Sequence, residues 1–70
     1  MPKSNIIFPN LRAEMARKGV EVQDIATQIG VARTTAGQKL SGKYELRLSE
    51  ALKIGELFPE VDMRKLFEKE

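Results

Sequence analysis

Apolar side chains recur three or four residues apart in several short stretches of the chain, with polar residues between them. This spacing gathers the apolar side chains on one face of a helix. The pattern predicts helices between Pro9 and Gly19, over 22–29, over 32–40, from Leu48 to the residues before Pro59, and after Asp62. No stretch alternates apolar and polar residues for long enough to predict a strand. The expected fold is therefore all-α, with four or five short helices around one core.

The second and third predicted helices are close together in the sequence. The first of them carries Val22, Ile25, Ala26 and Ile29 on one face and ends at Gly30, and the apolar spacing resumes with Ala36 and Leu40. Two short helices joined by a turn of three or four residues that contains glycine are typical of a helix-turn-helix. The sequence predicts such a unit over about 22–40, within a domain spanning 9–70 that follows an N-terminal arm over 1–8.

Composition narrows the possible functions. The seventy residues include no cysteine, histidine or tryptophan, so a disulfide framework, a zinc cage and the commonest catalytic base are excluded. The ten carboxylates are scattered, and no glycine-rich phosphate loop is present. We expect neither an enzyme nor a protein with a cofactor, metal or small-molecule substrate.

Charge is unevenly distributed although the net charge is only +2. Residues 31–43 contain Arg33, Lys39 and Lys43 and no acid. An acid-free segment of this kind suits an anionic partner such as DNA, and it is equally compatible with an ordinary solvated face.

The residues of the predicted helix-turn-helix resemble a known family. The segment QDIATQIGVARTT over 23–35, followed by KLSGK over 39–43, resembles the helix-turn-helix of phage Cro and repressor proteins and their XRE-type relatives. The segments FPNLRAE over 8–14 and LSEALKI over 48–54 also look like those of small phage or prophage regulators. The resemblance implies a transcriptional regulator whose recognition helix, 32–40, enters the major groove of double-stranded DNA.

The same resemblance assigns roles to individual residues. Those implied to face base edges are Ala32, Arg33, Thr34 and Gln38. Those implied to contact phosphates are Gln23, Thr35, Ser41 and Lys43. Arginine can bind guanine through two hydrogen bonds and glutamine can bind adenine in the same way, whereas phosphate contacts position the domain without reading sequence.

The chain departs from the family pattern at several positions. Serine or threonine usually precedes the second, third and fourth helices, where this chain has Glu21, Ala32 and Arg47, so we expect weak N-terminal caps and marginal stability. Val22 replaces a glutamine that binds the DNA backbone. Gly37 lies inside the recognition helix, either to allow close approach to DNA or because the demand for DNA binding is relaxed.

A domain this small makes few base contacts, so we expect a homodimer on two half-sites or a hetero-partner. The candidate pairing surface comprises Leu57, Phe58, Val61, Met63, Leu66 and Phe67, with the arm Ile6-Ile7-Phe8 as a second candidate; both could instead complete the core. The alternative function is a helix-turn-helix that binds a partner protein, as a repressor modulator or an antitoxin does.

The N-terminal residues 1–8 contain one charge and a three-residue apolar run. This run is too short for a signal peptide, and no segment is apolar enough to span a membrane. We therefore expect a cytoplasmic protein that does not bind membranes.

Overall fold

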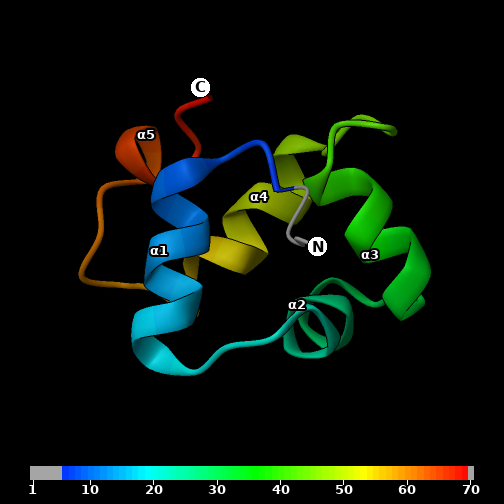
Figure 1. Cartoon of the computed structure of the whole chain (residues 1–70), viewed down its shortest axis with the longest axis horizontal. Coiled ribbons are helices and arrows are strands. Elements are labelled where there is room, and N and C mark those ends of the chain that lie inside the picture. The colour runs from blue at the N-terminus through cyan, green and yellow to red at the C-terminus, as the bar shows by residue number, and fades with distance from the viewer. Residues whose placement is uncertain (1–5, 70) are drawn as a thin grey trace.

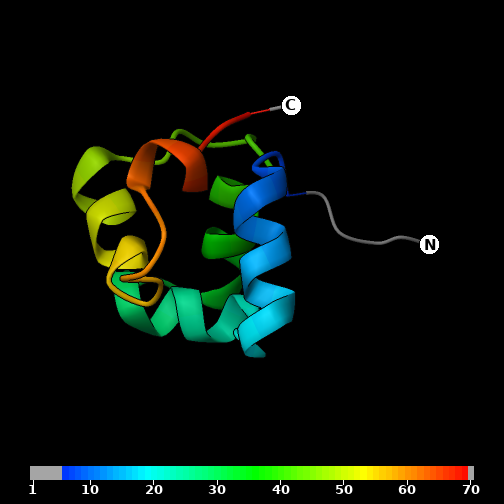
Figure 2. The ribbon, with the colours of Figure 1, turned by 90° about the vertical axis from the view of Figure 1, so that its left-hand side faces the viewer.

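A computed structural model describes residues 6–69, and within them every regular element is a helix. The helices are α1 (Pro9–Lys18), α2 (Val22–Ile29), α3 (Arg33–Leu40), α4 (Leu48–Gly55) and α5 (Met63–Leu66). The all-α prediction is confirmed. Figure 1 shows α1 and α3 on the two sides of the molecule with α4 behind them, and the view turned by 90° in Figure 2 shows α2 and α5 at opposite ends of the molecule.

Every helix contributes at least one side chain to a single core. The fully or almost fully buried apolar residues are Phe8, Leu11, Met15, Ile25, Ala26, Ile29, Ala36, Leu40, Ile54, Phe58 and Leu66. No polar or charged side chain is buried among the described residues. The fold is therefore held mainly by apolar burial, which is the dominant favourable contribution in a small domain.

The segment from Leu57 to Phe67 completes this core. Phe58 and Leu66 have no exposed surface, and Leu57, Val61, Met63 and Phe67 are partly buried, three of them packed against the core cluster. Burial of Phe58 and Leu66 removes these two residues from the predicted pairing surface, because α5 packs back onto α1. Leu57, Val61, Met63 and Phe67 keep part of their surface exposed, and their role in pairing stays a prediction. In the arm, Phe8 is buried and its ring meets the Phe67 ring edge to face, 5.5 Å between centroids.

The start of α1 agrees with the sequence prediction. The helix begins at Pro9 with Phe8 as its N-cap, because proline fits the first helical position, where an N–H would have no partner inside the helix. Asn10, the first polar residue of the helix, does not cap it. It instead donates from Nδ2 to the carbonyl oxygen of Lys65 at 2.8 Å, which ties α1 to α5.

The weak caps are confirmed in part. Neither Ala32 nor any side chain near it caps α3. At α2 the Asp24 carboxylate accepts the Glu21 N–H at 2.8 Å, and at α4 the Glu50 carboxylate accepts the Arg47 N–H at 3.0 Å. At α2 and α4 these first-turn acids make up for the missing serine or threonine cap. Of these three helices, α3 is the one whose start has no such side-chain hydrogen bond.

Within residues 6–69, no helix combines the length and the apolar character needed to cross a lipid bilayer.

Candidate nucleic-acid interface

The turn between α2 and α3 is built on Gly30. Its φ of 77° lies in the left-handed region that glycine adopts without strain. The N–H groups of Gly30 and Val31 both donate to the carbonyl oxygen of Ala26, at 2.8 and 3.0 Å. Ala26 itself has no exposed surface, and α2 packs more extensively on α3 than any other two helices pack together. The chain thus forms the predicted pair of short helices joined by a tight turn.

The first turn of α3 faces away from the protein. Ala32, Arg33 and Thr34 are exposed, whereas Thr35 and Gln38 are half-buried. The Arg33 side chain has no hydrogen-bond or ion-pair partner among residues 6–69. Thr34 and Gln38 are one helical turn apart and so lie on the same side of α3. Three of the four residues predicted to read bases therefore belong to α3 and Ala32 is its N-cap, with Arg33 and Thr34 the most accessible of the polar ones.

The last turn of α3 is anchored to the rest of the molecule. Leu40 is buried, and its carbonyl oxygen accepts the N–H of Ile7 at 2.9 Å. The carbonyl oxygen of Gln38 accepts the N–H of Lys43 at 3.0 Å, across a turn in which Gly42 has a φ of 88°. A Cβ at Gly42 would lie 3.1 Å from a methyl group of Ile7, so both the φ and the close approach favour glycine there.

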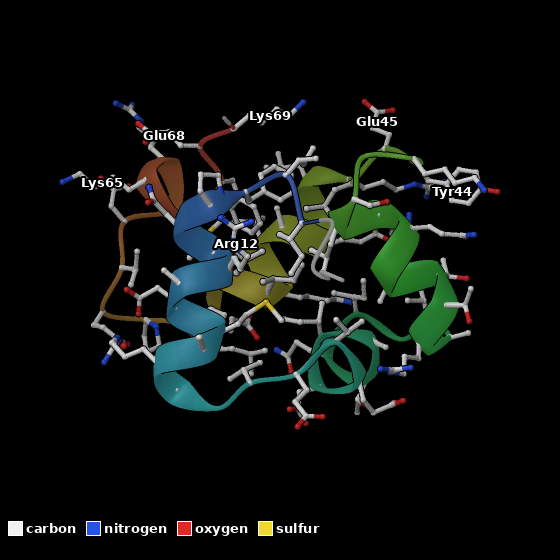
Figure 3. The ribbon with its side chains drawn as sticks, viewed as in Figure 1. Arg12, Tyr44, Glu45, Lys65, Glu68 and Lys69 are labelled. Atoms are coloured by element: carbon white, nitrogen blue, oxygen red, sulfur yellow. The ribbon has the colours of Figure 1, made fainter. Side chains whose placement is uncertain are left out.

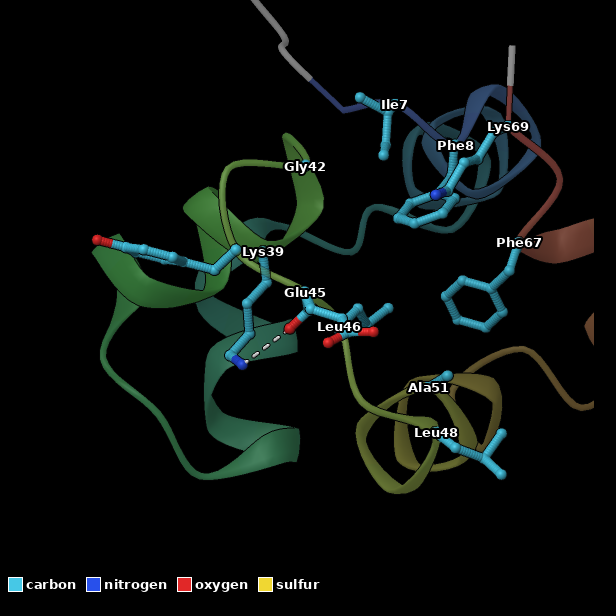
Figure 4. A pocket seen from close by; sticks show the side chains of 11 residues that line it. Ile7, Phe8, Lys39, Gly42, Glu45, Leu46, Leu48, Ala51, Phe67 and Lys69 are labelled. Atoms are coloured by element: carbon cyan, nitrogen blue, oxygen red, sulfur yellow. Dashed lines mark hydrogen bonds between the residues drawn. The ribbon is translucent and has the colours of Figure 1, made fainter.

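An ion pair joins the same end of α3 to α4. The Lys39 ammonium lies 3.1 Å from the Glu50 carboxylate, and the two side chains are only 13% and 15% exposed. Lys39 also donates to the carbonyl oxygen of Glu45 at 3.3 Å (Figure 4). Burial alone would raise the pKa of Glu50, but the Arg47 N–H and the Lys39 ammonium together hold that pKa below its ordinary value.

This ion pair changes the expected charge of the interface. Lys39 counted toward the acid-free segment 31–43, yet Glu50 neutralises it, so Arg33 and Lys43 are the cations of that segment left without an acidic partner among the described residues. The signal that identifies Glu50 is its position: the third residue of the predicted fourth helix is where an acid caps the helix start. The spacing of residues along the sequence gave no indication that the Glu50 side chain also forms an ion pair with Lys39 of α3.

The residues predicted to contact phosphates are spread over the two ends of the helix pair. Gln23 is exposed near the start of α2, where its amide donates to the Thr27 hydroxyl at 3.3 Å. Lys43 is exposed and unpaired beyond the end of α3, within the described chain. The Ser41 hydroxyl donates to the carbonyl oxygen of Gln38 at 2.9 Å, and the half-buried Thr35 is less accessible. Gln23 and Lys43 thus remain the accessible donors of this set.

Val22 and Gly37 are neighbours across the α2–α3 packing. A Cβ on Gly37 would meet a Val22 methyl at 4.0 Å, an ordinary van der Waals distance, so packing inside the protein does not require glycine at this position. Val22 packs against the core cluster, which explains an apolar residue where the family pattern has glutamine.

Exposed acids lie near both ends of this helix pair. Glu21 and Asp24 are exposed at the start of α2, and Glu45 follows the exposed Tyr44 in the loop after α3. Figure 3 shows Tyr44 extending from the loop beyond the end of α3. Among residues 6–69, no three acidic side chains come together in an arrangement that could hold a metal ion.

No protein-family model, no curated protein and no solved structure matches this chain.

Proposed function

We propose that the protein is a sequence-specific DNA-binding transcriptional regulator of the phage Cro and repressor type, acting in the cytoplasm. The observation that carries the proposal is the exposed first turn of α3, which presents the unpaired Arg33 next to Thr34 in a segment without acids. A helix packed across a second helix in this way can enter the major groove, where its first residues meet base edges.

The role that we propose for each residue follows from the exposure of its side chain. Arg33 donates two hydrogen bonds to guanine, and Thr34 and Gln38 contact neighbouring bases from the same face, while Ala32 meets a thymine methyl. Lys43 and Gln23 contact phosphates on either side and set the register. Ser41 and Thr35 contribute less, because the Ser41 hydroxyl already has an acceptor and Thr35 is half-buried.

A fluorescence titration against the DNA upstream of the protein's own gene, at two salt concentrations, tests the proposal. Each phosphate contact makes the affinity fall more steeply as salt rises. Arg33→Ala should reduce discrimination between this DNA and an unrelated duplex, with a loss of about 1–3 kcal/mol.

The matched control is Arg64→Ala. Arg64 is an exposed arginine on α5 whose side chain has no partner among residues 6–69, so its loss should leave discrimination unchanged. A uniform fall in affinity for both duplexes in Arg33→Ala would make Arg33 a phosphate contact. Absence of DNA binding at low salt would refute the function.

The second candidate is a helix-turn-helix that acts through a partner protein, as a repressor modulator or an antitoxin. The exposed Glu21 and Asp24 favour it, because they place negative charge at the start of α2, where the family pattern has phosphate contacts. A stable complex with the product of a neighbouring gene, together with no DNA binding at low salt, would establish this function instead of the first.

A further inference from the structure

The sulfur of Met63 lies where α5 meets the end of α4. Met63 is the first residue of α5, and its side chain packs against Gly55, the last residue of α4. A Cβ on Gly55 would overlap the Met63 sulfur and would lie 3.5 Å from the Met63 Cε methyl group. The missing side chain at Gly55 therefore lets the thioether reach the backbone of α4. Among the five glycines, Gly55 is the one that a side chain approaches most closely.

Met63 is more accessible than the other methionine of the described chain. Met15 is only 6% exposed within the core, whereas Met63 is half-buried. The third methionine, Met1, lies outside the described residues. Because the chain has no cysteine, all of its sulfur belongs to methionine. Within residues 6–69, Met63 therefore carries the sulfur that a dissolved oxidant reaches more easily.

The contact with Gly55 is one of few that hold α5 in place. This helix is a single turn of four residues. It is held by the buried Leu66, by the hydrogen bond of Asn10 to its backbone, and by Met63. Figure 2 shows the loop 56–62 leading from the end of α4 to α5. A helix this short has little stability of its own, so its position depends on such contacts.

Further contacts lead from α5 to the last turn of α3. Phe67, directly after α5, meets the ring of Phe8 edge to face (Figure 4). The neighbouring Ile7 donates its N–H to the carbonyl oxygen of Leu40 at 2.9 Å. The arm thus packs on the end of α5 on one side and holds the last turn of α3 on the other.

We propose that Met63 is a site of oxidation by hydrogen peroxide and that its sulfoxide releases α5 from α4. The thioether sulfur attacks one peroxide oxygen, and the O–O bond breaks as the S–O bond forms. A proton passes from the transferred hydroxyl group to the other oxygen, which leaves as water. The sulfur loses two electrons and the peroxide gains them. The product is a polar, chiral side chain in place of an apolar one.

The sulfoxide does not fit the contact with Gly55. The sulfur already fills the space that a Cβ would take, so the side facing α4 has no room for an added oxygen. A sulfoxide oxygen is also a hydrogen-bond acceptor, and burying it without a donor is unfavourable. The oxidised side chain therefore turns toward water, and the contact between α4 and α5 is lost.

Peptide mapping by mass spectrometry tests the site. After brief treatment of the folded protein with hydrogen peroxide, trypsin separates Met15 and Met63 into the peptides 13–17 and 54–64. Met63 should gain one oxygen much faster than Met15, because the core shields the Met15 sulfur. In concentrated urea the two methionines should react at equal rates.

Thermal melting tests the structural consequence. Oxidation should lower the melting temperature of the wild type by about 4–8 °C, the shift that loss of one modest interaction produces in a domain of about 60–100 residues. Methionine sulfoxide reductases with a dithiol should restore the original value.

Two leucine variants are the matched controls. Met63→Leu keeps an apolar side chain of similar volume without the sulfur, so peroxide should leave its melting temperature unchanged. Met15→Leu removes the buried sulfur instead and should respond to peroxide like the wild type.

Gly55→Ala tests the geometry of the contact. The new methyl group takes the place of the Met63 sulfur, so the contact is lost before any oxidation. Peroxide should therefore oxidise Met63 faster than in the wild type and yet lower the melting temperature by much less. Comparing this variant with itself before and after treatment cancels the higher helix propensity of alanine.

The consequence for DNA rests on the proposed function. Because the arm holds the last turn of α3, the oxidised wild type should bind the upstream DNA more weakly, whereas peroxide-treated Met63→Leu should bind as before. Unchanged DNA affinity after complete oxidation of Met63 would overturn this link between α5 and α3.

Equal oxidation rates of Met15 and Met63 in the folded protein would overturn the proposed site, as would an unchanged melting temperature once Met63 is oxidised. Neither measurement involves DNA. A protein that binds no DNA in either state therefore overturns only the proposed function.

Discussion

The two helices of the helix-turn-helix are stabilised in different ways. Helix α2 buries Ile25, Ala26 and Ile29, has an acid that caps its start, and ends at the Gly30 turn. Helix α3 buries only Ala36 and Leu40 and begins without any side-chain cap. Both contain eight residues, so length does not account for the difference.

The two helices differ in which of their turns is anchored to the rest of the molecule. Apart from buried Ala36, the anchors of α3 are at its last turn: buried Leu40, the Lys39–Glu50 ion pair and the turn at Gly42. At the start of the helix, Arg33 and Thr34 are exposed and make no side-chain hydrogen bond or ion pair within residues 6–69. A helix held at one end can present the other end to a partner without losing its orientation. This is the arrangement that we propose for base recognition.

The largest expected effect comes from removing the apolar anchor of α3. Leu40→Ala should lower the free energy of unfolding by about 2–5 kcal/mol, because it leaves a cavity where the helix meets the core. Leu52→Ala, at a half-exposed leucine, should cost much less. Urea or thermal unfolding monitored by circular dichroism compares the two. Equal losses would show that α3 does not depend on its last turn.

The Lys39–Glu50 ion pair in the last turn of α3 should contribute less to the free energy of unfolding than Leu40 does. Glu50→Gln should cost about 1–2 kcal/mol, between the values for exposed and buried pairs. Glu45→Gln, at an exposed acid with no ion pair among the described residues, is the control and should be nearly neutral.

This contribution should also depend on pH. Because the pKa of Glu50 is lowered in the folded protein, its stabilising effect is complete above the ordinary carboxyl pKa of 4.5 and is lost as the pH falls through the lower, folded-state pKa. The stability difference between the wild type and Glu50→Gln should therefore vanish in acid. A difference that is constant with pH would contradict the assigned role of the ion pair.

Supplying the missing cap should strengthen the free end of α3. Ala32→Ser should raise the free energy of unfolding by about 1 kcal/mol, since the hydroxyl can accept a first-turn N–H. The same substitution at Ala16, inside α1, should lower stability by about 0.5 kcal/mol. An unchanged or lower melting temperature for Ala32→Ser would count against the view that the start of α3 lacks a stabilising cap.

The smallest effect is expected at Gly37. Gly37→Ala should stabilise by about 0.5–1 kcal/mol, because a Cβ there meets only an ordinary contact with Val22. Gly30→Ala should instead destabilise, because its φ is 77°. DNA affinity of Gly37→Ala separates the two interpretations of this glycine. Weaker binding indicates that close approach requires it, and unchanged binding indicates relaxed demand.

Much of the fold could be predicted because local rules determine it. Apolar spacing located all five helices, and Gly30 and Asp62 marked a helix end and a helix start correctly. Long-range packing was not predictable from spacing. The surplus of apolar residues after Leu57 suggested a surface, but α5 folds back and buries Phe58 and Leu66. The exposed leucines, Leu48 and Leu52, belong to α4. The apolar spacing of this helix did not distinguish them from its buried residues.

The candidate site divides in a similar way. Its backbone frame follows from Ala26, Gly30 and Gly42, whose positions in the sequence are informative. Which side chains remain available depends on partners far along the chain: Glu50 neutralises Lys39, eleven residues away. The Gln38 carbonyl oxygen accepts a hydrogen bond from the Ser41 hydroxyl at the end of α3. Only a three-dimensional structure distinguishes such engaged groups from Arg33.

Hydrogen–deuterium exchange of the protein with and without its upstream DNA tests the central claim most directly. The account predicts that DNA slows exchange in the peptide covering 31–40 and leaves the peptide covering 62–69 unchanged, and that Arg33→Ala reduces this protection while Arg64→Ala does not. Unchanged exchange over 31–40 in the presence of bound DNA would contradict the assignment of α3 as the recognition helix.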